Sequence, residues 1–179
     1  MKKVYLVLTD TGTTFSKMIR KHTGDKYNHI SISLREDLSE MYSFGRRNAY
    51  IFFYGGFVIE KPRHGTFKRF NKTSALVFEL PVEDDAYAII EDMIQHFISE
   101  RKRFGYNIRG IFKARKNVNY QGSFRRFYCS QFVSHLLVCA RVIPEDFFGG
   151  VPTPTKFSMI PSLKPLYEGL LWDYAPPTE

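Results

Sequence analysis

The chain has 179 residues, of which 44% are hydrophobic, and carries 26 Lys and Arg against 18 Asp and Glu. This length favours a single domain over residues 1–179, and the 17 Phe and 11 Tyr can fill a core, which argues against a disordered protein. Much of the net charge of +8 lies in two runs without an acidic residue, 61–73 and 101–126. Such runs attract phosphate, nucleic acid, anionic lipid or acidic polymers, or are simply solvated faces.

The N-terminal half is predicted to be mostly strands. Residues 4–9 are an apolar run typical of a buried strand, and residues 11–24 predict a short helix capped by Thr11 or Thr13. In residues 28–34 apolar and polar side chains alternate strictly, which predicts a strand with His29 and two serines on one face. Three further strands are predicted over residues 41–47, 55–61 and 74–82.

Helices are predicted to dominate the C-terminal half. A long amphipathic helix is expected to begin at Asp84 or Asp85, and a second one at Cys129, followed by a proline-rich tail over residues 151–169. There is no internal repeat. Strands followed by helices within one compact length predict a single α+β domain.

The termini and the cysteines bear on location. The apolar run at the N-terminus is shorter than the core of a signal peptide, and no stretch approaches the length of a membrane span. Cys129 and Cys139 would lie ~15 Å apart on one helix, which is too far for a disulfide. We therefore expect a reducing, cytoplasmic location. The spacing of the cysteines does not suggest zinc, and we expect no cofactor and no metal ion.

Two interpretations of Cys129 remain open from the pattern alone. Cysteine is often a small buried hydrophobe, and Cys129 lies over the apolar face of its helix. Alternatively, the N-terminus of a helix and a cationic histidine would lower the pKa of its thiol and make it a nucleophile. Of the five histidines, His29 is the best candidate partner, because small serines share its strand face. The other four are expected at the surface: His22, His64, His96 and His135.

Two short motifs carry a resemblance to a known family. "YNHISISL" followed by "MYSFGR", with "FYCSQFVSHLL" about a hundred residues later, resembles the permuted papain-like branch of the NlpC-type cysteine hydrolases. Lecithin:retinol acyltransferase-like enzymes share this order, in which the histidine strand precedes the cysteine helix. The resemblance implies a papain-like α+β fold with an antiparallel sheet packed against helices.

The resemblance also assigns catalytic roles. Cys129 matches the nucleophile and His29 the base of the family. The residue that orients the histidine usually lies on the following strand, where this sequence offers Ser43, Tyr42 or, at the edge, Glu40; we select Ser43. The backbone N–H of Cys129 and one unidentified donor would form the oxyanion hole.

The expected activity is that of a cysteine hydrolase, an amidase or peptidase that forms a Cys–His acyl-enzyme on a small amide or peptide substrate. A lipid-directed acyltransferase or thioesterase, and a non-catalytic basic binding module, are the alternatives. We expect the basic segment 101–126 to border the site and to favour anionic substrates. No nucleic-acid-binding motif is present, and the sequence leaves the oligomeric state open.

Overall fold

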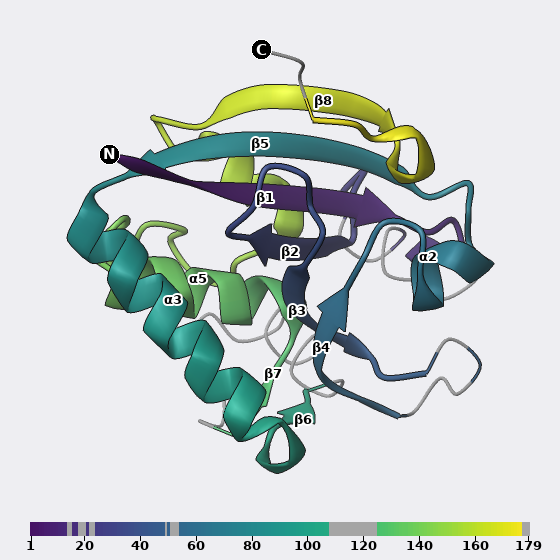
Figure 1. The fold of residues 1–179 in the computed structure, drawn as a ribbon, viewed down its shortest axis with the longest axis horizontal. Coiled ribbons are helices and arrows are strands. Elements are labelled where there is room, and N and C mark those ends of the chain that lie inside the picture. The colour runs from purple at the N-terminus through teal and green to yellow at the C-terminus, as the bar shows by residue number, and fades with distance from the viewer. Residues whose placement is uncertain are drawn as a thin grey trace.

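The computed structural model describes residues 1–13, 16–17, 21, 24–48, 50, 54–107 and 125–176. These residues form an α+β fold around one eight-stranded sheet (Figure 1). The strands are β1 (Lys2–Asp10), β2 (His29–Ser33), β3 (Met41–Arg46), β4 (Gly55–Glu60), β5 (Ser74–Val82), β6 (Gly105–Tyr106), β7 (Arg126–Phe127) and β8 (Lys164–Leu170). The described helices are α2 (Gly65–Arg69), α3 (Asp84–Ser99) and α5 (Cys129–Cys139), with 3-10 turns η1 (Arg101–Arg103), η2 (Pro154–Met159) and η3 (Leu171–Asp173).

The strand order of the sheet is β7-β6-β4-β3-β2-β1-β5-β8. Neighbouring strands are antiparallel except β6 and β7, which pair in parallel. Within β1, Thr9 pairs with His29, so the buried N-terminal strand fixes where β2 begins. Because β2, β3 and β4 are consecutive in the sheet, side chains from three strands can meet on one face.

Apolar residues cover both faces of the sheet. The larger cluster packs α3 and α5 against one face, and Figure 1 shows these two helices next to each other. At its centre the fully buried Phe44 contacts five other aromatic rings: Phe57, Phe97, Phe104, Phe127 and Phe132. Alternate residues of β1, including Tyr5 and Val7, belong to a smaller cluster with Phe67 of α2 and Leu171 of η3. The alternation of β1 therefore divides the apolar residues between two layers.

The predicted strands over residues 4–9, 28–34, 41–47, 55–61 and 74–82 are confirmed within one or two residues at their ends, as are the helix starts at Asp84 and Cys129. The tail contains an unpredicted strand, β8, which pairs with β5 at the edge of the sheet. Its Pro165 is tolerated because an edge strand leaves one side unpaired. No described helix is both long enough and apolar enough to cross a membrane.

Two predicted segments fall largely outside the described residues. In the first, 11–24, Thr13 Oγ1 accepts a hydrogen bond from the Ser16 N–H at 3.2 Å, as a capping threonine does. Several residues of that predicted helix, among them Phe15 and Met18, lie outside the described part. In the second, the basic segment 101–126, residues 108–124 lie outside it.

Replacing Phe44 with Ala should lower the free energy of unfolding by about 3–5 kcal/mol, because it removes the ring around which the larger cluster is packed. Urea denaturation followed by circular dichroism measures this. The matched control is Ile89→Ala on the exposed side of α3, where a change within about 0.5 kcal/mol is expected. Equal losses in the two variants would contradict this description of the core.

Candidate active site

A histidine and a glutamate from different strands meet on the sheet. His29 is the first residue of β2, and Glu60 is the last residue of β4. The distance between His29 Nε2 and Glu60 Oε2 is 2.9 Å. The Ser31 hydroxyl donates to the same carboxylate oxygen at 2.6 Å. Both side chains are largely buried, with exposed fractions of 17% for His29 and 12% for Glu60, so the carboxylate has two firm donors in a poorly solvated place.

Gly45 of β3 provides the space in which the two side chains meet. A Cβ atom at this position would lie 3.5 Å from His29 Cε1 and 3.6 Å from a Glu60 carboxylate oxygen. These are ordinary van der Waals distances, so a methyl group would just fit, while a larger side chain would displace the imidazole or the carboxylate. The side chains of His29 and Glu60 therefore pack against Gly45.

Cys129 is the first residue of α5, and α5 packs against β2 and β3. Its side chain is 5% exposed and belongs to the larger apolar cluster, so the interpretation as a buried apolar residue is partly correct. The same side chain is close enough to His29 to raise the pKa of the imidazole. In the first turn of a helix the backbone N–H groups have no intrahelical acceptors, which suits them to bind an anion at Cys129.

The electrostatic surroundings favour a protonated histidine. Burial alone would lower the pKa of His29, but the charge of Glu60 and the hydrogen bonds to Cys129 and Glu60 outweigh it and raise the pKa to about 10. Burial would raise the pKa of Glu60, yet His29, Ser31 and Arg46 together lower it. At neutral pH the pair is therefore imidazolium and carboxylate, and the imidazolium faces the thiol.

Tyr106 of β6 is a further polar group close to the thiol. Burial raises the pKa of Tyr106 well above its usual range, and the charge of Cys129 raises it further. Its hydroxyl therefore keeps its proton at neutral pH and can donate a hydrogen bond. Sequence reasoning did not single out this residue, because a two-residue strand after a basic run has no periodicity to reveal it.

The residues proposed from sequence to orient His29 are engaged elsewhere. The buried Ser43 hydroxyl donates to the Ile30 carbonyl at 2.7 Å. The Tyr42 hydroxyl donates to Glu40 Oε2 at 2.8 Å, so these two side chains contact each other. It is Glu60, which sequence reasoning missed, that contacts the imidazole. The available signal was a lone carboxylate at the end of the strand "GGFVIE", whose other residues are apolar or glycine.

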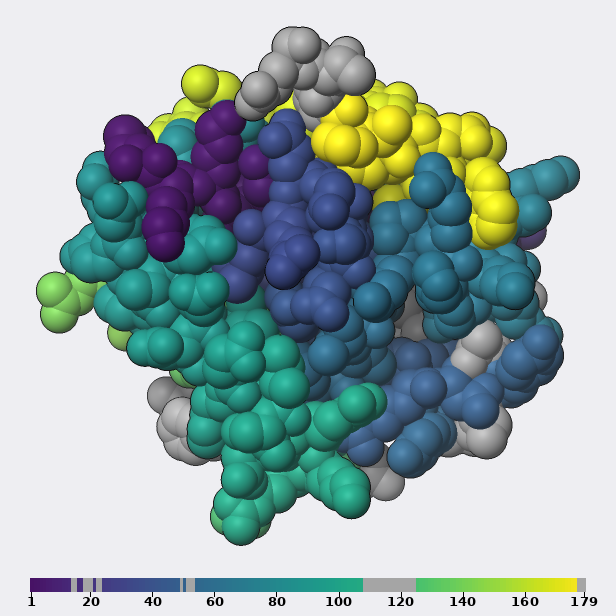
Figure 2. All heavy atoms as spheres, viewed as in Figure 1, coloured from purple at the N-terminus to yellow at the C-terminus, as the bar shows by residue number. Residues whose placement is uncertain are grey.

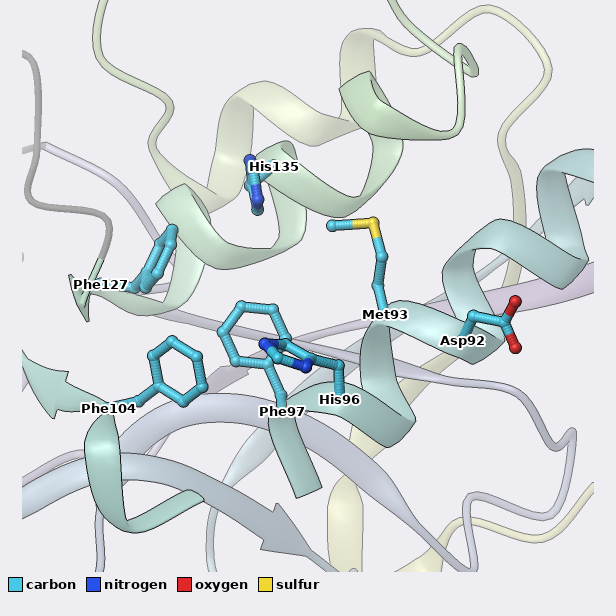
Figure 3. Close-up of a pocket in the computed structure, with 7 residues that line it drawn as sticks. All are labelled: Asp92, Met93, His96, Phe97, Phe104, Phe127 and His135. Atoms are coloured by element: carbon cyan, nitrogen blue, oxygen red, sulfur yellow. The ribbon is translucent and has the colours of Figure 1, made fainter. Parts of the chain in front are cut away.

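The other described histidines, His64, His96 and His135, line two cavities. His96 and His135 line a cavity of about 360 Å³ between α3 and α5, together with Phe97, Phe104 and Phe127 (Figure 3). Burial lowers the pKa of His135, which fits a partly covered ring rather than the expected surface residue. His64 precedes α2, and His22 lies outside the described residues.

Across the part of the chain that the structure describes, no three His, Cys, Asp or Glu residues are arranged to hold a metal ion. Comparisons of this chain with protein-family models, with curated proteins and with solved structures found no match.

Replacing Glu60 with Gln should slow the alkylation of Cys129 at pH 7 severalfold or more, because it removes the charge that raises the pKa of His29 and leaves the burial that lowers it. Iodoacetamide labelling followed by peptide mass spectrometry measures the rate. Ser43→Ala is the matched control, since its hydroxyl serves a backbone carbonyl, and its rate should equal that of the unmodified protein. A slow Ser43→Ala and a normal Glu60→Gln would reverse the assignment.

The His29–Glu60 pair should also make stability depend on pH. A histidine whose pKa is raised from 6.5 to about 10 stabilises the fold fully below pH 6.5 and loses that effect as the pH rises toward 10. The difference in unfolding free energy between the unmodified protein and His29→Gln should therefore shrink over this window. Denaturation at a series of pH values measures it, and a difference that grows with pH would contradict the charged pair.

Proposed function

We propose that the protein is a cysteine hydrolase of the amidase or peptidase type, with Cys129 as nucleophile, His29 as proton carrier and Glu60 as the group that orients and charges the histidine. The observation that carries this proposal is the 2.9 Å contact between His29 and Glu60, together with a cysteine, Cys129, that is close enough to raise the pKa of the same imidazole. A buried cysteine with only a structural role would not require a charged histidine–carboxylate pair beside it.

In the proposed reaction Cys129 has already lost its proton, and its thiolate, beside imidazolium His29, attacks the carbonyl carbon of an amide to form a carbon–sulfur bond. The electrons of the carbonyl move to its oxygen, which is held by the N–H of Cys129 at the start of α5, with Tyr106 as the candidate for the second donor. The carbon–nitrogen bond then breaks, and imidazolium His29 gives its proton to the leaving amine. Water, deprotonated by the now neutral His29, attacks the thioester. The carbon–sulfur bond breaks, the acid is released, and the Cys129 thiolate beside imidazolium His29 is restored.

The proposal includes the fold family. The order of a histidine strand before a cysteine helix, with the sheet mostly antiparallel, supports a permuted papain-like domain of the NlpC type. A lipid-directed acyltransferase or thioesterase would use the same groups and differ in the acyl donor and in the acceptor that resolves the thioester.

The two cysteines provide a sharp test, because the cysteine that is more exposed to solvent is not the one that the proposal expects to be more reactive. Cys139 is exposed, and partial burial raises the pKa of its thiol, whereas Cys129 is buried beside an imidazolium. Limiting iodoacetamide at pH 7 should label Cys129 at least about tenfold faster than Cys139. Faster labelling of the exposed Cys139 would contradict an activated nucleophile and favour a non-catalytic module.

Acyl-enzyme formation tests the reaction itself. Incubation with a panel of p-nitrophenyl esters should add one acyl group, located on Cys129 by peptide mass spectrometry, and Cys129→Ala should show none. His29→Ala should acylate slowly while remaining folded. Loss of the acyl group to water indicates a hydrolase, and its transfer to an added amine or alcohol indicates an acyltransferase. No acylation of Cys129 by any ester of the panel would contradict the proposal.

A further inference from the structure

A second cavity, of about 310 Å³, is lined by Glu60 but not by His29. Its lining comes from the end of β3, from β4 and from α2, with Arg101 of η1; we call it the basic pocket. Figure 2 shows residues of β4 and α2, in blue to teal, side by side on the face turned to the viewer. Neither Cys129 nor His29 is among the residues that line it, so this cavity is not the acyl-binding part of the proposed active site.

The lining of the basic pocket has a strong excess of positive charge. Arg46, Arg47, Lys61 and Arg101 line it, and Glu60 is the acidic residue among its lining side chains. The Glu60 carboxylate is already engaged by His29 and Ser31. Among the described residues, the ion pair of Lys61 is an exposed contact of 3.9 Å with Glu40. Glu60 interacts with Arg46, so the acidic side chains offset part of the positive charge of the four cations and leave an excess.

Two arginines that line the pocket are held in place by neighbouring groups: Arg46, the last residue of β3, and Arg47, which follows it. The Arg47 guanidinium lies over Gly56, where a Cβ atom would come within 2.6 Å of Nη2, so the glycine makes room for it. The same guanidinium donates to the backbone carbonyl of Phe104 at 2.8 Å and to that of Arg101. Its buried Nε has no hydrogen-bond partner among the described residues. Arg46 is partly buried, with its guanidinium 5.5 Å from the centre of the Phe70 ring.

We propose that the basic pocket binds a small ligand through a phosphate monoester group, with Arg46 and Lys61 as its main charge partners. Guanidinium groups match the geometry of phosphate oxygens and bind them in pairs of hydrogen bonds. A phosphate monoester carries a charge of about −1.5 to −2, which suits several clustered cations better than a single carboxylate does. The volume of about 310 Å³ is at the small end of ligand sites, which fits a small molecule or a single lipid headgroup.

This inference goes beyond the proposed hydrolase, and it is tested independently of it. Titration of the protein with glycerol 3-phosphate at low salt, followed by isothermal calorimetry, should give saturable one-to-one binding. Arg46→Gln and Lys61→Gln should each weaken it, by about tenfold for the arginine, since hydrogen bonds to charged groups are the stronger ones. Lys164→Gln, the same change at an exposed position on β8, is the matched control and should leave the affinity unchanged.

Two further arms decide between explanations. Cys129→Ala should bind glycerol 3-phosphate normally, so failure of catalysis and failure of this site are distinguishable. Vesicles of phosphatidic acid in phosphatidylcholine identify the source of the phosphate group. If the protein binds these vesicles and glycerol 3-phosphate displaces it, the pocket accepts a lipid headgroup. If the protein binds them no better than vesicles of phosphatidylcholine alone, the ligand of the pocket is a soluble phosphate. Absence of saturable binding at low salt, or equal binding by Lys61→Gln and Lys164→Gln, would overturn the proposal.

Discussion

The buried contact between His29 and Glu60 is the interaction on which the candidate site depends. Two charges removed from water stabilise a fold only if each has good partners, and removal of one partner leaves an uncompensated buried charge. Here the carboxylate accepts hydrogen bonds from His29 and Ser31, and Arg46 adds a favourable charge. The pair is therefore a constraint on the whole neighbourhood, because changes at the serine, the arginine or the glycine beneath the ring act on its charge state.

Because the pair is built from three neighbouring strands, each of these strands has a different residue composition. β2 supplies a histidine and small serines, β3 supplies Gly45, against which the pair packs, and β4 is apolar until it ends in Glu60. Residues next to these in the same strands, Ile30 and Phe44, belong to the cluster that positions α5. One alternating sheet thus builds the core that places the Cys129 helix and the polar contact that charges its partner histidine.

The parts of the site visible in the sequence were those set by local pattern. Strict alternation around His29 and the apolar face after Cys129 predicted a strand and a helix start, and both are observed. Glu60 could not be found in this way, because it reaches His29 across β3, and that approach depends on strand order and register. Ser43 has the expected polar character but satisfies the Ile30 carbonyl. β8 was missed because prolines and an irregular pattern mark a tail unless an edge strand is available to pair with it.

Glu60 belongs both to the candidate site and to the lining of the basic pocket. Its carboxylate contacts an imidazolium, and the residue also lines a pocket with Arg46, Lys61 and further cations. A single carboxylate cannot neutralise both the imidazolium and the cations of the pocket, so the region around Glu60 carries an excess of positive charge even when the His29–Glu60 pair has formed.

An anion in the pocket would reduce that excess. It would also compete with Glu60 for Arg46, which is one of the groups that lower the pKa of Glu60. Because such coupling is reciprocal, the protonation state of the His29–Glu60 pair must in turn affect how tightly the pocket holds an anion. Glu60 is in this way the shared residue through which a ligand of the pocket and the His29–Cys129 contact would influence each other.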